Sequence, residues 1–101
     1  MRTSNYFYKM NFDFNKEKNE LIDKERGISF YQVIEIISEK GVLLDINHPN
    51  PEKFPNQKMF VIEIDHYTYC IPYVINNETY FLKTIYANRN FLYLLKEDAN
   101  E

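Results

Sequence analysis

Five basic side chains stand close to the ends of the helices and strands that the sequence predicts. They are Arg26, His48, Lys58, Lys83 and Arg89. Metal-independent cleavage of RNA requires a group that deprotonates the 2′-hydroxyl, a cation that neutralises the pentavalent phosphate and an acid for the leaving 5′-oxygen. Side chains of these types can fill those roles. On spacing alone, however, a solvated surface charge explains each of them more simply.

The sequence argues against several other kinds of chemistry. Its two glycines, Gly27 and Gly41, lie outside any phosphate-binding loop or dinucleotide fingerprint, which argues against nucleotide cofactors. The two histidines, His48 and His66, lack a third ligand at a recognisable spacing. Cys70 falls within a predicted strand, where a small buried hydrophobe is a simpler interpretation than a reactive thiol. We therefore expect no cofactor and no metal.

The composition indicates one small domain. The chain has 101 residues, 45% of them hydrophobic, and a domain of this size buries roughly two thirds of its unfolded surface. A single cysteine excludes an intramolecular disulfide, and no apolar run has the length of a signal peptide or membrane helix. We expect a soluble protein in a reducing cytoplasm. The net charge of -3 argues against broad nonspecific nucleic-acid binding, although a local basic cluster can still bind phosphates.

Two helices are predicted to follow a short aromatic strand over residues 6–14. Asn15 is suited to cap the first helix, "KEKNELIDKER", which ends at Gly27. Ser29 begins a capping box for the second helix, which ends at Gly41. The apolar stripe of this second helix, wide enough to pack on a sheet, consists of Phe30, Val33, Ile34 and Ile37.

The remaining sequence predicts mostly strands. A short apolar run, "VLLDI", precedes a loop rich in proline and asparagine, and three strands follow as an antiparallel meander with a tight turn at Asn76-Asn77. Pro72 cannot donate to a ladder, so its strand should be an edge strand or bulged there. Phe91, Leu94 and Leu95 have the spacing of a short final helix. We predict an α+β domain over residues 1–101, with an antiparallel sheet, two helices packed on one side and a short C-terminal helix.

Two segments of the chain resemble the BrnT family of toxins. In that family a short strand F-x-W-D leads into a helix ending K-H-G, followed by a hydrophobic residue, Ser and Phe, and residues 10–30, "MNFDFNKEKNELIDKERGISF", are similar to this pattern. The positions that fall on this frame without a gap are Phe12, Phe14, Asn15, Lys18, Gly27, Ser29 and Phe30. After its last strand the family has a segment like I-S-A-R-K, which residues 85–90, "IYANRN", resemble. Residues 1–9 lie outside the match, as an N-terminal extension.

The chain departs from the family pattern at several positions. Phe14 replaces the usual tryptophan, Asn15 the aspartate, Arg26 the histidine before the glycine, and Ala87 the serine before the arginine. The proline-rich loop is also longer. The resemblance is therefore to a divergent member of the family.

The resemblance implies a type II toxin with a small RelE-like fold. Such a toxin is an endoribonuclease that cleaves mRNA, inhibits translation and is neutralised in a complex with a cognate ribbon-helix-helix antitoxin. Arg89 takes the place of the family's arginine, which implies that it faces a phosphate. No membrane contact is implied.

Together, these arguments predict a site. The predicted catalytic residues are Arg89, Lys83, His48 and Arg26, and the predicted RNA-binding residues are Lys58, Tyr69 and Asn88. Arg26 can bind a phosphate but cannot act as a base at neutral pH, so a base must come from His48 or a tyrosine, or catalysis is mostly electrostatic. The alternative is a noncatalytic protein-interaction module on the same scaffold.

Overall fold

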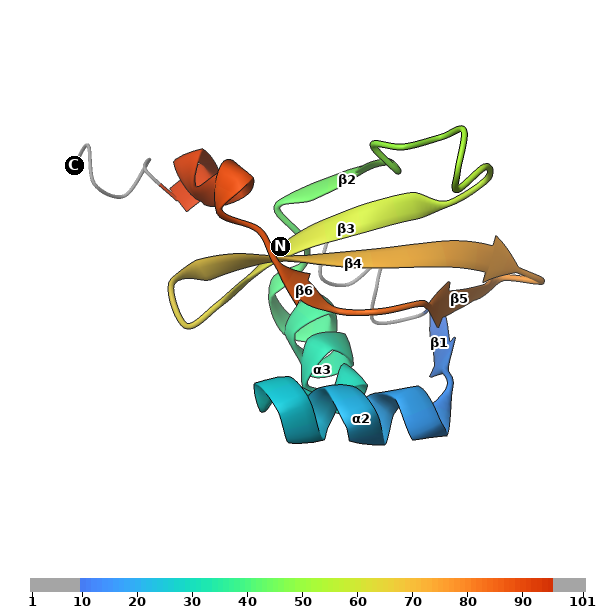
Figure 1. Ribbon diagram of the computed structural model, residues 1–101, viewed down its shortest axis with the longest axis horizontal. Helices are drawn as coiled ribbons and strands as arrows, with labels where there is room; N and C mark the ends of the chain where they lie inside the picture. Colours follow the sequence, from blue (N-terminus) through green and yellow to red (C-terminus); the bar gives the residue numbers. More distant parts are fainter. Residues whose placement is uncertain (1–9, 96–101) are drawn as a thin grey trace.

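A mixed six-stranded sheet forms the centre of the protein in this computed structural model, which describes residues 10–95 (Figure 1). Its strands are β1 (Asn11–Phe14), β2 (Leu44–Asn47), β3 (Lys58–Ile64), β4 (Tyr67–Asn76), β5 (Thr79–Leu82) and β6 (Tyr86–Ala87). The strand order is β1-β5-β4-β3-β2, and β6 pairs with β4 beyond the end of β5. The predicted α+β class is confirmed. Most pairs are antiparallel as predicted, while β1 joins the edge of β5 in parallel.

Local signals fix the two helices where the sequence predicts them. Helix α2 (Lys16–Arg26) begins where the Asn15 side chain accepts a hydrogen bond from the Lys18 backbone N–H at 2.8 Å. Helix α3 (Phe30–Lys40) begins at Ser29 in the same way. Gly27 ends α2 with φ 72°, a conformation that glycine adopts without strain. Within the described residues, no helix is long and apolar enough to cross a membrane.

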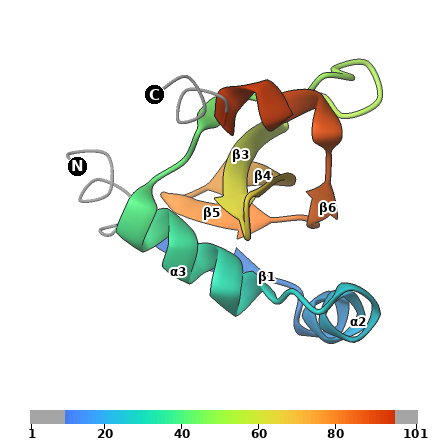
Figure 2. The ribbon, with the colours of Figure 1, turned by 90° about the vertical axis from the view of Figure 1, so that its left-hand side faces the viewer.

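The two faces of the sheet have separate apolar layers because strand side chains alternate in direction. On one face Phe60 and Ile62 pack with Phe30, Val33 and Ile37 of α3, and all five are almost completely buried. On the other face, three buried residues pack against β2, β6 and the 3₁₀ helix η1 (Arg89–Leu95); they are Met59, Val61 and Cys70. Figure 2 shows α2 and α3 on one side of the sheet and the helix η1 on the other.

The predicted C-terminal helix is therefore present as η1, and it covers the face opposite α3. The hairpin turn between β4 and β5 lies at Asn77 and Glu78, one residue later than predicted, and both have positive φ. The first four residues of the predicted strand 6–14 and the predicted N-terminal extension, residues 1–9, lie outside the described residues.

Pro72 interrupts the pairing of β4 with its neighbours between β5 and β6. β4 pairs with β3 over residues 67–73, including Met59 opposite Pro72, so it is an inner strand there rather than an edge strand. On its other side β4 pairs with β5 and then with β6, and residues 83–85 between them belong to no strand. Lys83 N–H donates to the Pro72 carbonyl at 2.8 Å, but Pro72 has no N–H to return on that side. The ladder therefore opens between β5 and β6.

Candidate functional site

A basic hollow lies beside this interruption, and we call it the β5–β6 hollow. It has a volume of ≈ 360 Å³. Its walls come from α2, the loop after β2, Pro72 of β4 and three residues that follow β5, and its basic side chains are Lys18, His48 and Lys83. No aspartate or glutamate of the described chain lines it. In a protein with a net charge of -3, this hollow is a local cluster of basic side chains, whose charge suits an anion.

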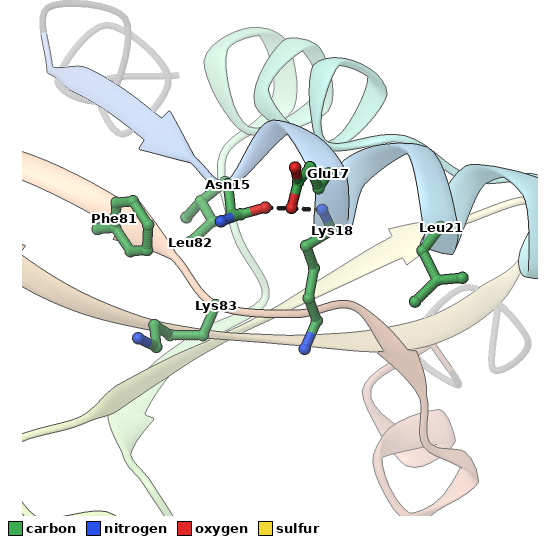
Figure 3. A pocket seen from close by; sticks show the side chains of 7 residues that line it. All are labelled: Asn15, Glu17, Lys18, Leu21, Phe81, Leu82 and Lys83. Carbon is green, nitrogen blue, oxygen red and sulfur yellow. Dashed lines mark hydrogen bonds between the residues drawn. The ribbon is translucent and has the colours of Figure 1, made fainter.

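Lys18 and Lys83 also line a second hollow of ≈ 540 Å³, which we call the α2 hollow. Figure 3 shows Lys18 extending from the first turn of α2 and Lys83 from the segment directly after β5. The Lys83 ammonium lies 5.2 Å from the centre of the Phe81 ring, a cation–π contact that orients it without removing its charge. Glu17 lies in the α2 hollow but not in the β5–β6 hollow. The two lysines therefore stand at the boundary of both spaces.

His48 is held in one tautomer. The Asn50 backbone N–H donates to His48 Nδ1 at 3.1 Å, so in the neutral ring Nδ1 is an acceptor and Nε2 carries the proton. The ring packs against Phe54 with their centres 4.4 Å apart. In this arrangement His48 offers a hydrogen-bond donor to a ligand. It does not offer an unprotonated nitrogen at Nε2.

The phenol of Tyr86 and the thiol of Cys70 are shielded from reaction at neutral pH. Burial raises the pKa of Tyr86, whose hydroxyl donates to the sulfur of Met59 at 3.4 Å, and the neighbouring Cys70 raises it further. Burial likewise raises the pKa of Cys70, partly opposed by hydrogen bonds from Asn88 and Tyr86. Both groups therefore remain protonated near pH 7, which fits Cys70 as a small buried hydrophobe.

Arg26 connects α2 to the interrupted segment. Its Nη1 donates to the backbone carbonyl of Ile85, one residue from Thr84 and Tyr86, which both line the β5–β6 hollow. A guanidinium holds such a carbonyl while its other N–H groups remain available as donors. Arg26 therefore lies outside the lining of the hollow and positions the chain that forms it.

Three other predicted residues lie on β4, directly after β6 and at the start of η1, away from this lining. Asn88 caps η1, since its side-chain oxygen accepts from the Asn90 N–H at 2.9 Å. Tyr69 is half-buried opposite Ala87, with its ring 6.1 Å from that of Tyr67. Arg89 is the exposed first residue of η1 and has no ion pair with any residue from 10 to 95. The structure thus brings His48 and Lys83 together but leaves Arg89 apart from them.

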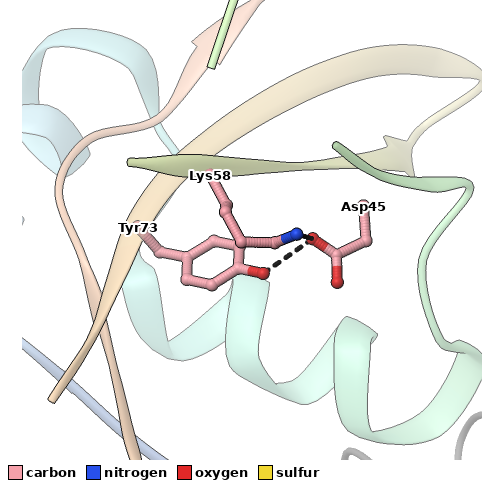
Figure 4. A network of polar contacts seen from close by, with 3 residues as sticks. All are labelled: Asp45, Lys58 and Tyr73. Atoms are coloured by element: carbon pink, nitrogen blue, oxygen red, sulfur yellow. Dashed lines mark hydrogen bonds and ion pairs between the residues drawn. The ribbon is translucent and has the colours of Figure 1, made fainter. Parts of the chain in front are cut away.

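Lys58 belongs to a polar cluster that joins three strands (Figure 4). Its ammonium lies 4.0 Å from Asp45 Oδ1 on β2, and the hydroxyl of the buried Tyr73 on β4 donates to the same oxygen at 2.6 Å. Lys58 also lines a third hollow, of ≈ 410 Å³, together with His48 and residues of the loop. Its charge is partly balanced within the fold.

Sequence reasoning missed Lys18 as a site residue, together with four uncharged side chains of the lining. Those four are Phe54, Gln57, Thr84 and Tyr86. The position of Lys18 is a signal in the sequence. A lysine in the first turn of a helix opposes the helix dipole, so helix stability does not explain it. The other four carry no such local signal.

Among residues 10–95, no group of three or more histidine, cysteine, aspartate or glutamate side chains is placed to hold a metal ion. Comparisons of the chain with protein-family models, curated proteins and solved structures found no match.

Proposed function

We propose that this protein is an RNA-cleaving toxin of the type II toxin–antitoxin class whose β5–β6 hollow binds the RNA backbone. The observation that carries the proposal is the convergence of Lys18, Lys83 and His48 on one space without a carboxylate. Two ammonium groups and an imidazole N–H are suited to the oxygens of a phosphodiester. The acidic net charge confines this affinity to one place on the surface.

The reaction in this proposal is an in-line displacement at phosphorus. The 2′-oxygen bonds to phosphorus, the bond from phosphorus to the 5′-oxygen breaks, and a 2′,3′-cyclic phosphate and a 5′-hydroxyl result. Lys18 and Lys83 neutralise the charge that grows on the nonbridging oxygens, and His48 Nε2–H donates a hydrogen bond to them.

The proton of the 2′-hydroxyl passes to hydroxide in this scheme, and the departing 5′-oxygen takes a proton from water. His48 Nδ1 is engaged with Asn50, and the raised pKa of Tyr86 keeps its phenol protonated. The cleavage rate should therefore rise about tenfold per pH unit from pH 6 to 8, without the plateau that a side-chain base titrating near neutrality would produce. A rate that levels off within this pH range in the wild type but not in His48→Gln would contradict this scheme.

The biological setting in this proposal follows from the resemblance to BrnT-family toxins in residues 10–30 and 85–90. It includes mRNA as the substrate, arrest of translation in the cytoplasm, and a ribbon-helix-helix antitoxin as the neutralising partner. It also keeps Arg89 as a phosphate-binding residue. In the structure Arg89 is exposed and unpaired within the described chain, so it is available to RNA that extends beyond the hollow.

The direct test is cleavage of a mixed-sequence RNA by the purified protein in the presence of a chelator. We expect fragments that end in 2′,3′-cyclic phosphate, and a strong loss of cleavage in Lys83→Ala. Lys24→Ala is the matched control, because Lys24 is an exposed lysine on α2 that lines no part of the hollow. Intact RNA after incubation with folded wild type would contradict the proposal.

A noncatalytic interaction module is the second candidate. It is favoured by the protonated state of Tyr86, the hydrogen bond at His48 Nδ1 and the structural role of Arg26, which together leave no side-chain base among them. Large apolar side chains are also exposed on several elements, at Leu21, Tyr31, Ile75 and Tyr93. Retention of a specific protein partner by a chain that binds and cleaves no RNA would favour this candidate.

A further inference from the structure

The β5–β6 hollow is lined by apolar surface as well as by cations. Phe54 from the proline-rich loop, Pro72 from β4 and the ring of Tyr86 all line it. Its volume of ≈ 360 Å³ lies within the range of about 300–1,000 Å³ that small-molecule sites occupy. A phosphate alone uses none of this apolar surface. The walls therefore suit a flat, uncharged group that is attached to an anion.

Two polar side chains in the same lining are suited to the edge of such a group. Gln57 and Thr84 are both half-buried, and neither side chain has a hydrogen-bond partner among residues 10–95. An amide and a hydroxyl can each donate and accept. This combination matches the edge of a nucleobase, which presents donors and acceptors side by side.

We infer that the hollow seats one unpaired nucleobase of single-stranded RNA, stacked against Phe54. Its edge faces Gln57 and Thr84, and its phosphate lies between Lys18 and Lys83. This inference rests on the proposed function and names its substrate more closely. Stacking on an aromatic ring tolerates all four bases, so Phe54 separates RNA from other polyanions rather than one base from another.

The first test compares two polyanions. Fluorescence anisotropy measures the affinity of the full chain for a 2′-O-methyl RNA octamer, which cannot be cleaved because its 2′-oxygen cannot attack. Competition with inorganic polyphosphate measures the affinity for the second polyanion. In Phe54→Leu, which keeps apolar volume but not the ring, RNA affinity should fall about 5- to 150-fold, the measured range for loss of one base stack. Polyphosphate affinity should fall much less, because Lys18 and Lys83 remain, although Phe54 also packs against His48. Tyr93→Ala removes an exposed aromatic residue of η1 and should leave both affinities unchanged.

The second test uses an intrinsic probe. The chain has no tryptophan, so Phe54→Trp places a single indole at the proposed stacking position. Uridine 5′-monophosphate should quench its fluorescence, because the base stacks on the indole. Inorganic phosphate at the same concentration should not. The substitution should also retain or strengthen RNA binding, since a larger ring is available.

The outcomes separate this inference from the proposed function. Stacking of a nucleobase on Phe54 is wrong if RNA affinity is unchanged in Phe54→Leu, or if RNA and polyphosphate affinities fall equally. It is also wrong if nucleotide and phosphate quench the Phe54→Trp fluorescence equally. If Phe54→Leu selectively loses RNA affinity but the wild type cleaves no RNA, nucleobase binding at Phe54 is supported and the proposed cleavage is wrong. If the wild type cleaves RNA and Phe54→Leu binds and cleaves it equally well, only the inference of nucleobase binding at Phe54 is wrong.

Discussion

The lysines of this chain stand in two opposite electrostatic surroundings. Lys58 lies 4.0 Å from Asp45, which also accepts the hydroxyl of the buried Tyr73, so this lysine is part of a cluster that joins β2, β3 and β4. Lys18 and Lys83 have no ion-pair partner in the described part of the chain and border a hollow without a carboxylate. A paired lysine thus supports the fold, whereas two lysines without an ion pair in the described chain, at the edge of a hollow, are available to a ligand.

Removing both lysines of the β5–β6 hollow should have the largest effect on RNA cleavage. In Lys18→Ala/Lys83→Ala, RNA cleavage should fall about 10²- to 10⁴-fold, because hydrogen bonds to charged groups are worth about 1.5–3 kcal/mol each. The free energy of unfolding should hardly change, since both side chains are exposed. Single-turnover cleavage and urea denaturation measure the two effects.

The matched control for this double variant is Lys24→Ala/Lys40→Ala, which removes the same charge from exposed positions on α2 and α3 outside the lining of the β5–β6 hollow. An equal loss of cleavage in this control would show that the net charge matters and the hollow does not.

Variants of Arg26 test whether RNA cleavage depends on the hydrogen bond that holds Ile85, next to the residues that line the hollow. Arg26→Ala removes the donor to the Ile85 carbonyl, and cleavage should fall about 10- to 100-fold as residues 83–86 shift. Arg26→Lys keeps a charge and a donor and should recover part of the loss. A positioning role predicts that the affinity for polyphosphate, which needs only charge, falls less than kcat. Polyphosphate affinity that falls as far as kcat would instead assign Arg26 to direct phosphate binding.

The Lys58 cluster should respond in stability rather than in RNA cleavage. Tyr73→Phe removes a hydrogen bond from a fully buried ring to Asp45 and should lower the free energy of unfolding by about 1.5–3 kcal/mol. Lys58→Ala breaks an ion pair whose side chains are about 40% and 34% exposed, so it should cost about 0–1 kcal/mol. Urea denaturation compares them, and a larger loss in Lys58→Ala would reverse the assigned roles.

The buried thiol and phenol predict a smaller effect at alkaline pH. Unfolded Cys70 and Tyr86 ionise near pH 9.0 and 10.0, while burial raises both pKa values in the folded state. At these two groups the folded chain therefore holds more protons than the unfolded chain above about pH 9, so their contribution to stability is fully present below that pH and is lost as pH rises. Denaturation from pH 7 to 10.5 measures this, and Cys70→Ala should reduce the slope. An unchanged slope would contradict the assigned cause.

How much the sequence could predict depended on the distance between the residues involved. The caps at Asn15 and Ser29 and the stop at Gly27 involve neighbours in the chain, and the structure has all three. The α+β class follows from the same local patterns, together with the alternating strands.

The site depends on contacts that no local pattern encodes. Lys18, His48 and Lys83 meet only because β4 pairs with β3, β5 and β6 in one register and because Pro72 interrupts the ladder. The sequence predicts that Pro72 places its strand at an edge or in a bulge, but the edge position is not observed, since β4 is an inner strand. The capping role of Asn88 likewise appears only once η1 is in place.

The salt dependence of RNA binding shows whether Lys18 and Lys83 bind phosphate groups of RNA. Each ammonium that neutralises a phosphate of a single strand contributes about -0.7 to the slope of log K against log salt. With the 2′-O-methyl RNA octamer, the wild type should bind with a negative slope, and Lys18→Ala/Lys83→Ala should bind more weakly with a slope shallower by about 1.4. No binding by the folded wild type, or the same slope in both proteins, would contradict the assignment of the β5–β6 hollow as the phosphate site.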